Sequence, residues 1–379
     1  MAIVHDRVVL QGNADAVEFC PRSPLLAAAT YTLLQEPQPR RLGSITLFQV
    51  HQQQAEDQRP SLRQLHRVET SGVFDIKWRP GSGDGAVPAC LAQAGSDGSI
   101  GLYCLDDGGT DNGMTLKEAQ TKPASSCMCL SLEWDPFPIN SSHSRIVISH
   151  SDGSLSTVRL DQGSLELDQT WQAHDFELWT TTFDFWKPSV VYSGADDCHF
   201  CVWDLREDLQ MPVYRNRRAH RMGVCCVQSN PLCEHVLVTG SYDETIRLWD
   251  SRMLQNPVLE AELGLGGGVW KVKWHPKNGK LLLAACMHNG FAILHANSLE
   301  VKVLEEYKGH KSLAYGADWY RGKSKNRVEM KDHQEQTHLG CQSEAEVVSR
   351  DILSPSLVAT CSFYDSALHL WEPRTCLDH

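Results

Sequence analysis

The sequence has no apolar run that approaches the roughly 18 residues needed to span a bilayer. Its first ten residues include His5, Asp6 and Arg7, whereas a secretion signal would be apolar there. Basic residues are also in short supply, because 35 Lys and Arg stand against 47 Asp and Glu and give a net charge of -12. A nucleic-acid-binding surface would be basic. We therefore expect a soluble, cytoplasmic protein without a membrane or nucleic-acid partner.

Sequence motifs for cofactors and metals are missing as well. We find no phosphate loop and no dinucleotide fingerprint. Cys198 and Cys201 form a C-x-x-C pair, but a structural zinc needs two further ligands, and on one strand the two cysteines would face opposite sides. The nearest match to a G-x-S-x-G nucleophile elbow, at 94–98, lies in a strand-to-strand turn with no helix after it. The sequence therefore predicts no cofactor and no metal site.

What the sequence does contain is an internal repeat of an apolar strand, a turn with Asp or Asn, and a second strand that usually ends in an aromatic residue. The clearest copy is VTGSYDETIRLWD at 238–250. Further copies join a turn Asp to an aromatic residue six positions later: Asp97 to Tyr103, Asp197 to Trp203 and Asp365 to Trp371. The turns at positions 197, 243 and 289 are 46 residues apart. A period of about 40–45 residues is typical of a β-propeller with four strands per blade.

A second signal marks the innermost strand of each blade, where an apolar stretch is usually followed by an aromatic residue and often by Pro. It is clearest at 73–80 and 269–276. Looser copies lie around Phe19, Trp134, Phe183, Ser229 and Trp319. Seven such strands predict seven blades. The predicted fold class is therefore all-β, a single seven-bladed WD-repeat β-propeller over residues 1–379.

The last repeat contains an additional polar and charged segment, 321–350. We predict that this segment is a disordered surface loop between the first and second strands of blade seven. The chain ends soon after the third strand of that blade. Arg7 to Leu10 is therefore predicted to supply the fourth strand and close the ring, which removes the open sheet edges. We expect the closed ring to be a monomer.

Three histidines precede the inner strands of blades four, five and seven. As catalysts they would act as acids or bases, but each has a turn Asp and a strand-end Trp at the spacing of its own blade. We predict that these histidines instead link each blade internally, in the pairs His174–Asp197, His220–Asp243 and His310–Asp365.

Alignment of the inner strands places one residue of each blade at an equivalent point near the strand start, at the rim of the central channel. These residues are Asp15, Phe74, Leu130, Trp179, Cys225, Trp270 and Tyr315. Four of them are aromatic, and Glu177 lies two residues before Trp179. Aromatic faces beside a carboxylate suit a quaternary ammonium group. We therefore predict substrate binding by Trp179, Trp270, Tyr315 and Phe74, although packing between blades is an alternative role for such residues.

Two turns depart from the repeat and supply further candidates. Blade seven has Tyr364 directly before its turn Asp, and we add Tyr364 to the predicted substrate-binding residues. Blade six has His288 in its turn and no Asp to pair with it, so His288 is a candidate general base, as is Glu177. A solvated turn histidine is the competing interpretation. Cys225 is the rival catalytic residue, because a thiolate attacks esters readily when its pKa is lowered.

Several of these segments together resemble a known family. They are HDFELW at 174–179, GGVWKVKWHP at 267–276, YGADW at 315–319, and the segments 239–250, 282–290 and 359–372. The chain resembles the methylated-diphthine methylhydrolases, which are the WD-repeat proteins of diphthamide biosynthesis. The resemblance covers essentially the whole chain and is strongest from His174 to Glu372.

The resemblance implies a carboxylic ester hydrolase that acts on translation elongation factor 2. In that substrate a modified histidine carries a trimethylammonium group and a carboxyl methyl ester, and the family releases methanol to leave diphthine for amidation. The resemblance transfers no catalytic residues, because the sequence has no recognisable esterase triad. The alternative is a non-catalytic scaffold, since most WD-repeat propellers only bind partners.

Overall fold

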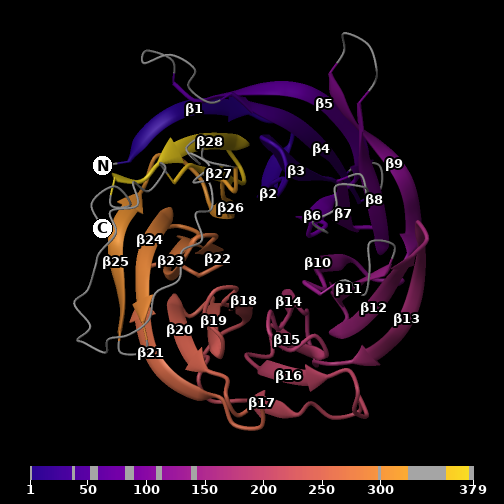
Figure 1. The fold of residues 1–379 in the computed structure, drawn as a ribbon, viewed down its shortest axis with the longest axis vertical. Coiled ribbons are helices and arrows are strands. Elements are labelled where there is room, and N and C mark those ends of the chain that lie inside the picture. Colours follow the sequence, from indigo (N-terminus) through magenta and orange to yellow (C-terminus); the bar gives the residue numbers. More distant parts are fainter. Residues whose placement is uncertain are drawn as a thin grey trace, which may run out of the picture.

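The computed structural model describes residues 2–35, 39–51, 59–81, 89–107, 113–137, 143–297, 300–322 and 356–374. Within these ranges, 28 strands form seven four-stranded antiparallel sheets around a central axis (Figure 1). Each sheet is one blade, and its first strand lies innermost. The predicted seven-bladed propeller is confirmed. No helix that could cross a membrane occurs in the described residues.

The strands of blades one to four follow in chain order, from the channel outward. Blade one contains β2 (Asn13–Phe19), β3 (Leu25–Leu34), β4 (Arg40–His51) and β5 (Ser61–Ser71). Blade two contains β6 (Val73–Trp78), β7 (Cys90–Gly95), β8 (Ser99–Asp107) and β9 (Met114–Pro123). Blade three contains β10 (Cys129–Trp134), β11 (His143–His150), β12 (Ser154–Asp161) and β13 (Ser164–Gln172). Blade four contains β14 (Thr180–Phe183), β15 (Val190–Gly194), β16 (Phe200–Asp204) and β17 (Tyr214–Asn216).

Blades five to seven complete the ring. Blade five contains β18 (Val224–Ser229), β19 (Val236–Ser241), β20 (Thr245–Asp250) and β21 (Val258–Gly264). Blade six contains β22 (Lys271–His275), β23 (Asn278–Ala285), β24 (Phe291–Asn297) and β25 (Glu300–Tyr307). Blade seven contains β26 (Ala314–Trp319), β27 (Val358–Ser362), β28 (Ala367–Glu372) and β1 (Ile3–Val9).

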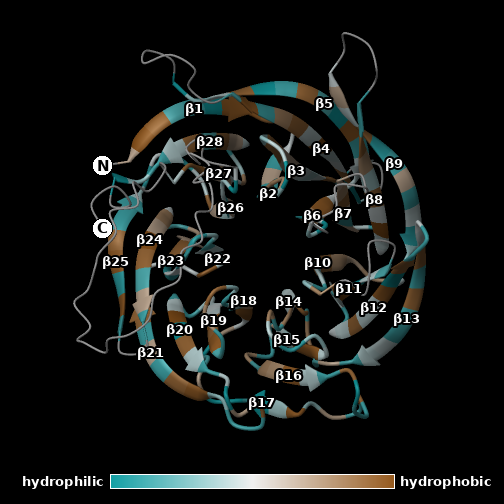
Figure 2. Cartoon of the chain, viewed as in Figure 1, coloured by the Kyte–Doolittle hydropathy of each residue, from teal (hydrophilic) through white to brown (hydrophobic). Residues whose placement is uncertain are grey.

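The hydrophobic core lies between neighbouring blades. One cluster, for example, packs Val238 and Ile246 of blade five against Val272 and Leu282 of blade six. Outer strands such as β13 and β25 mix polar and apolar residues, as the bands in Figure 2 show, and most of their residues are exposed or half-buried. A blade therefore buries its faces only against its neighbours, which is why the ring behaves as one unit.

The N-terminal strand closes the ring as predicted. β1 pairs with β28 in antiparallel register from Ile3↔Glu372 to Val9↔Ala367, and it forms the outermost strand of blade seven. The pairing starts at Ile3, earlier than the predicted Arg7. Apart from Arg321 and Gly322, the predicted loop 321–350 lies outside the described residues.

Candidate functional site

The channel has two ends, and we call the end where the inner strands begin the first mouth and the opposite end the second mouth. Near the start of five inner strands the antiparallel register shifts at one point. The residues at these bulges are Asp15, Phe74, Leu130, Cys225 and Tyr315. A β-bulge redirects a side chain locally. The aligned positions predicted from sequence are therefore structurally equivalent in these five blades. In the other two blades, Trp179 and Trp270 directly precede the inner strands β14 and β22.

Seven aromatic side chains at the first mouth form a chain of ring contacts, which we call the aromatic belt. Its successive centroid distances are Phe74–Tyr31 4.8 Å, Tyr31–Phe363 4.9 Å, Phe363–Tyr315 5.2 Å, Tyr315–Trp270 4.9 Å and Trp270–Trp179 5.6 Å, and Tyr242 lies 5.9 Å from Trp270 and 6.5 Å from Trp179. The predicted Tyr364 contacts this belt through Phe363, at 5.0 Å, and its side chain is 72% exposed. The structure thus brings all five predicted substrate-binding residues together.

Sequence analysis missed three members of the belt: Tyr31, Tyr242 and Phe363. Tyr31 lies on β3, and the other two follow β19 and β27 in the turns between the second and third strands. An alignment of inner strands cannot find them for this reason. The available signal was the aromatic residue next to the turn Asp, in Tyr242-Asp243 and in Phe363-Tyr364-Asp365.

Asp15 places a carboxyl group at the same mouth. Its residue is only 5% exposed, and its Oδ1 atom has no hydrogen-bond partner in the described part of the chain. Burial raises the pKa of Asp15 well above its usual range, with Lys271 opposing the shift. The Asp15 charge adds to the effect of burial on two belt phenols: the pKa of Tyr31 is raised to about 12, and that of Tyr315 also rises. Asp15 is thus a buried carboxyl among aromatic rings, in surroundings that disfavour its ionised form.

The two candidate general bases lie in different surroundings. Glu177 is half-buried, and its loop is held to the turn of blade four because its carbonyl accepts a hydrogen bond from the Asp196 N–H at 2.9 Å. The exposed Asp196 carboxylate in turn accepts a hydrogen bond from Trp179 Nε1 at 3.3 Å. His288 is exposed in the turn after β23, and its side chain makes no hydrogen bond within the described ranges. The belt therefore has carboxylates at its Trp179 end and an accessible imidazole in blade six.

Cys225 is poorly placed to be a nucleophile. Its residue is 5% exposed, and Sγ donates to the Gly223 carbonyl at 3.5 Å. Burial raises the pKa of this thiol well above its usual range. Because only the thiolate attacks an ester efficiently, the environment disfavours Cys225 in that role.

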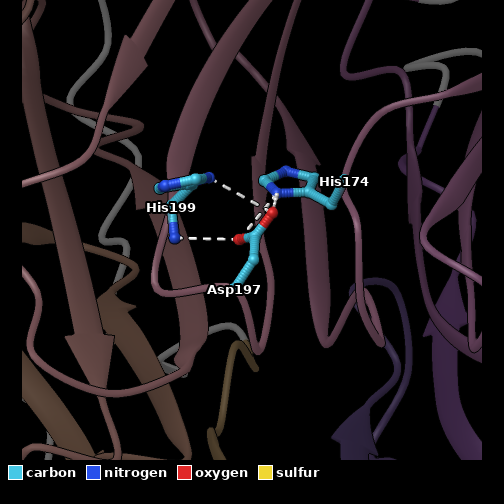
Figure 3. Close-up of side chains that lie close together, drawn as sticks. All are labelled: His174, Asp197 and His199. Carbon is cyan, nitrogen blue, oxygen red and sulfur yellow. Dashed lines mark hydrogen bonds and ion pairs between the residues drawn. The ribbon is translucent and has the colours of Figure 1, made fainter.

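The predicted histidine links differ between blades. In blade four the link is direct, because His174 Nδ1 lies 3.0 Å from Asp197 Oδ2 (Figure 3). His174 Nε2 bonds Ser193 Oγ at 2.8 Å. Ser193 also accepts a hydrogen bond from Trp203 Nε1 at 2.9 Å. Burial favours the neutral acid, but the hydrogen bond and charge of His174 prevail and lower the pKa of Asp197 to about 2.

The prediction was wrong for blades five and seven, where the links are relayed. In blade five Arg247 lies between His220 and Asp243. Its Nη1 donates to His220 Nδ1 and to Asp243 Oδ1, both at 3.0 Å. In blade seven a serine stands between the two groups, because His310 Nδ1 bonds Ser362 Oγ at 2.6 Å and that hydroxyl donates to Asp365. In both blades the histidine is neutral, since burial lowers the pKa of His220 and of His310 to about 3.

The C-x-x-C pair also differs from expectation. Cys201 lies on β16, but Cys198 lies in the preceding turn with φ of 63°. Next to it, His199 joins His174 and Asp197 in a group whose ligand atoms all lie within 4.8 Å of one another (Figure 3). Both ring nitrogens of His174 already have hydrogen-bond partners, so this group is part of the blade-four link.

A charged network separates the two mouths inside the channel. The buried Asp75 of blade two accepts hydrogen bonds from Lys77 Nζ at 2.7 and 2.8 Å. It also accepts one at 3.0 Å from Lys271 of blade six, on the other side of the axis (Figure 1). Burial opposes ionisation, yet Lys271 and Lys77 together hold the pKa of Asp75 well below its usual range. The pair between blades two and six therefore crosses the channel.

Comparisons with known proteins agree with this architecture. Residues 212–250 match the WD domain, G-beta repeat family model. A chain in a crystal structure of a mitotic checkpoint complex superposes with a TM-score of 0.65, covering 98% of this chain and 92% of that one at 15% identity, which shows the fold alone. Fold and repeats together define a WD-repeat β-propeller.

Full-length relatives narrow the class. The chain is 34% identical to a mouse diphthine methyltransferase, over 96% of this chain and 92% of the mouse protein. It is 33% identical to a human diphthine methyltransferase, over 95% and 96% of the two chains. A diphthine methyltransferase homolog of Dictyostelium discoideum is 28% identical over 98% and 99%. The chain belongs to the diphthine methyltransferase family, the WD-repeat family of diphthamide biosynthesis.

Proposed function

We propose that this protein is a carboxylic ester hydrolase that removes the methyl ester from methylated diphthine on translation elongation factor 2. Water adds to the ester carbonyl, the C–O bond to the methoxy group breaks, and methanol leaves with a proton. The products are methanol and the diphthine carboxylate. Family membership supports the substrate, and the aromatic belt with its carboxyl groups is the observation that carries the placement of the site.

The belt suits the fixed cation of that substrate. A trimethylammonium group is attracted to aromatic faces by about 0.5–2 kcal/mol per contact. In this proposal Trp179, Trp270 and Tyr315 contact the cation, with Phe74 and Tyr364 at the edge of the site. Asp15 would lose its proton to become the counter-ion, because a nearby positive charge favours the ionised carboxylate.

The reacting water needs a base within hydrogen-bond reach. His288 and Glu177 are the two candidates at the first mouth, and the chosen base accepts one proton from water as the oxygen attacks the carbonyl. The same group then returns the proton to the departing methoxide. This route forms no covalent bond to the protein and makes no use of the protonated Cys225 thiol.

Exposed apolar side chains around the first mouth indicate how a protein substrate would dock. Phe176 and Met222 are 58% and 52% exposed, and they lie in the loops that lead into blades four and five. A binding scaffold would need the same surface, so a scaffold is the second candidate function. The two functions differ in whether the ester is consumed.

The test uses purified protein, elongation factor 2 carrying the methylated intermediate, and water enriched in oxygen-18. Hydrolysis predicts loss of the ester methyl group, one oxygen-18 atom in the new carboxylate, and no requirement for S-adenosylmethionine. A reaction that requires a methyl donor would point to methyl transfer, as the names of the relatives suggest. Unchanged substrate that remains bound to the protein would identify a scaffold.

A further inference from the structure

The second mouth opens into a cavity that the proposed function does not use. Its volume is about 490 Å³, within the range of small-molecule sites. The walls come from the ends of the inner strands and the segments that follow them, and they include Trp78, Phe185 and Trp274. The charged side chains that line it are two carboxylates, Glu18 and Glu133, and two cations, Lys273 and Arg321.

The aromatic walls of this cavity are fixed by bonds between blades. Trp78 Nε1 donates to the Glu18 carbonyl at 3.1 Å, and Trp274 Nε1 donates to the Gln228 carbonyl at 3.4 Å. Each bond joins a tryptophan to the backbone of the preceding blade. The indole N–H groups are therefore already satisfied, and the rings present apolar surface to the cavity.

Glu18 contributes a buried carboxyl group to this wall, and its ion pair with Lys77 is long. It is only 4% exposed, and its Oε2 atom has no hydrogen-bond partner in the described ranges. The nearest cation, Lys77 Nζ, lies 4.0 Å away and already bonds both oxygens of Asp75. Lys273 and Arg321 lie near Asp318 Oδ1, at 3.8 and 3.7 Å. A buried carboxylate left in this state is costly, so a bound cation would stabilise it.

We propose that the second-mouth cavity binds an organic ammonium ion, with Glu18 as its counter-ion and the tryptophan-lined wall as its apolar surround. An alkylated ammonium fits better than a hard metal ion, because calcium takes six to eight oxygen ligands and the cavity offers mainly apolar surface. Low local polarity strengthens the attraction between the ammonium and the carboxylate. This site does not depend on the proposed ester hydrolysis.

Proton release should accompany binding. Burial raises the pKa of Glu18 to about 7, against the lowering effect of nearby cations. The charged groups that face Glu18 from the packed elements are Lys77, Lys273, Asp318 and Arg321, and Glu133 lies on the same cavity wall. Only the ionised carboxylate attracts the cation, and its fraction rises about ten-fold from pH 6 to pH 8 if the pKa is about 7. Affinity for the ammonium should therefore rise by about that factor over the same interval.

The experiment is calorimetric titration of the full chain with tetramethylammonium chloride at pH 6 and pH 8, in two buffers of different ionisation enthalpy. We expect proton release at pH 6 and an affinity about ten-fold higher at pH 8. In the Asp15→Asn background, which removes the proton-linked carboxyl of the first mouth, Glu18→Gln should weaken this binding at least about ten-fold and abolish its pH dependence. A peptide with trimethyllysine, tested beside the free ion, shows whether the cavity also accepts a protein-borne ammonium.

The matched control is Asp15→Asn, on the same strand but at the first mouth. If tetramethylammonium occupies both mouths, each variant should remove one site and leave the other. The proposal is wrong if Glu18→Gln binds tetramethylammonium as strongly as its parent. It is also wrong if the binding enthalpy of Asp15→Asn at pH 6 is the same in the two buffers, because no proton would then be released. If Asp15→Asn loses ester hydrolysis but still binds tetramethylammonium at Glu18, the two sites are independent. Either proposal can therefore be wrong while the other holds.

Discussion

The two mouths of the channel are built from the same inner strands, yet they differ in how their aromatic residues are used. β2 carries a buried carboxyl at each end, Asp15 toward the first mouth and Glu18 toward the second. At the first mouth, rings contact other rings, because turn residues such as Tyr242 and Phe363 add to those of the inner strands. At the second mouth, indoles bond the neighbouring backbone and leave a cavity between them. Turn residues therefore add rings to the first mouth, whereas a cavity remains between the indoles of the second mouth.

The largest expected effect concerns the chemistry of the first mouth. A general base typically contributes 10²–10⁴-fold to a rate, so His288→Ala or Glu177→Gln should lower ester turnover by about that factor. Because His288 is exposed, its variant should melt at the wild-type temperature. The measurement is single-turnover loss of the ester on elongation factor 2. Full activity in both variants would remove the activated-water mechanism and leave the belt as a docking surface.

A second prediction tests the blade that supports both mouths. Trp249 is 2% exposed and donates from Nε1 to Thr239 Oγ1 at 2.9 Å. Trp249→Ala should lower the free energy of unfolding by about 3–5 kcal/mol through the cavity that it leaves. Denaturant unfolding followed by circular dichroism measures this change, with Trp249→Phe as the milder comparison. A variant that unfolds at the wild-type denaturant concentration would show that the blade assignment is wrong.

A third prediction concerns the relayed link of blade five. Asp243→Ala should lower the free energy of unfolding by about 1–3 kcal/mol, because it leaves the buried Arg247 without its closest carboxylate. In a double-mutant cycle with Arg247→Met, Asp243→Ala should lower the free energy of unfolding by less, because the buried Arg247 charge is then absent. Equal losses in the two backgrounds would show that Asp243 acts independently of Arg247.

The smallest expected effect is on substrate affinity at the belt. Trp270→Ala should weaken binding of the trimethylammonium substrate by about 0.5–2 kcal/mol, as expected for one lost cation–π contact. The change should appear in KM more than in kcat. Trp274→Phe, on the same blade but at the second mouth, is the control that should keep the wild-type KM. A Trp270→Ala protein with unchanged KM would separate the belt from substrate binding.

The fold could be predicted from the sequence because each repeat of the sequence corresponds to one blade. The repeat of turn Asp or Asn and strand-end aromatic predicted a propeller, and seven inner-strand signals predicted seven blades. The missing fourth strand of blade seven and the N-terminal segment predicted how the ring closes. Side-chain partners were less predictable. Arg247 is four residues after Asp243 and takes the position between it and His220, which spacing alone does not show.

The site was only partly predictable for a similar reason. Inner-strand alignment found Phe74, Trp179, Trp270 and Tyr315, because the start of the inner strand repeats from blade to blade. It did not single out Asp15 or Glu18 as sites. The importance of these carboxyls comes from burial without a full set of partners, a property of the packed channel that no linear pattern records.

The most direct test of the distinction between the mouths is the rate of ester hydrolysis on elongation factor 2 by Asp15→Asn and Glu18→Gln, measured side by side. We predict that Asp15→Asn lowers kcat/KM at least about ten-fold, because the cation of the substrate loses its counter-ion. Glu18→Gln should hydrolyse the ester at the wild-type rate. A loss of hydrolysis in Glu18→Gln with wild-type activity in Asp15→Asn would place the substrate at the second mouth and contradict the account.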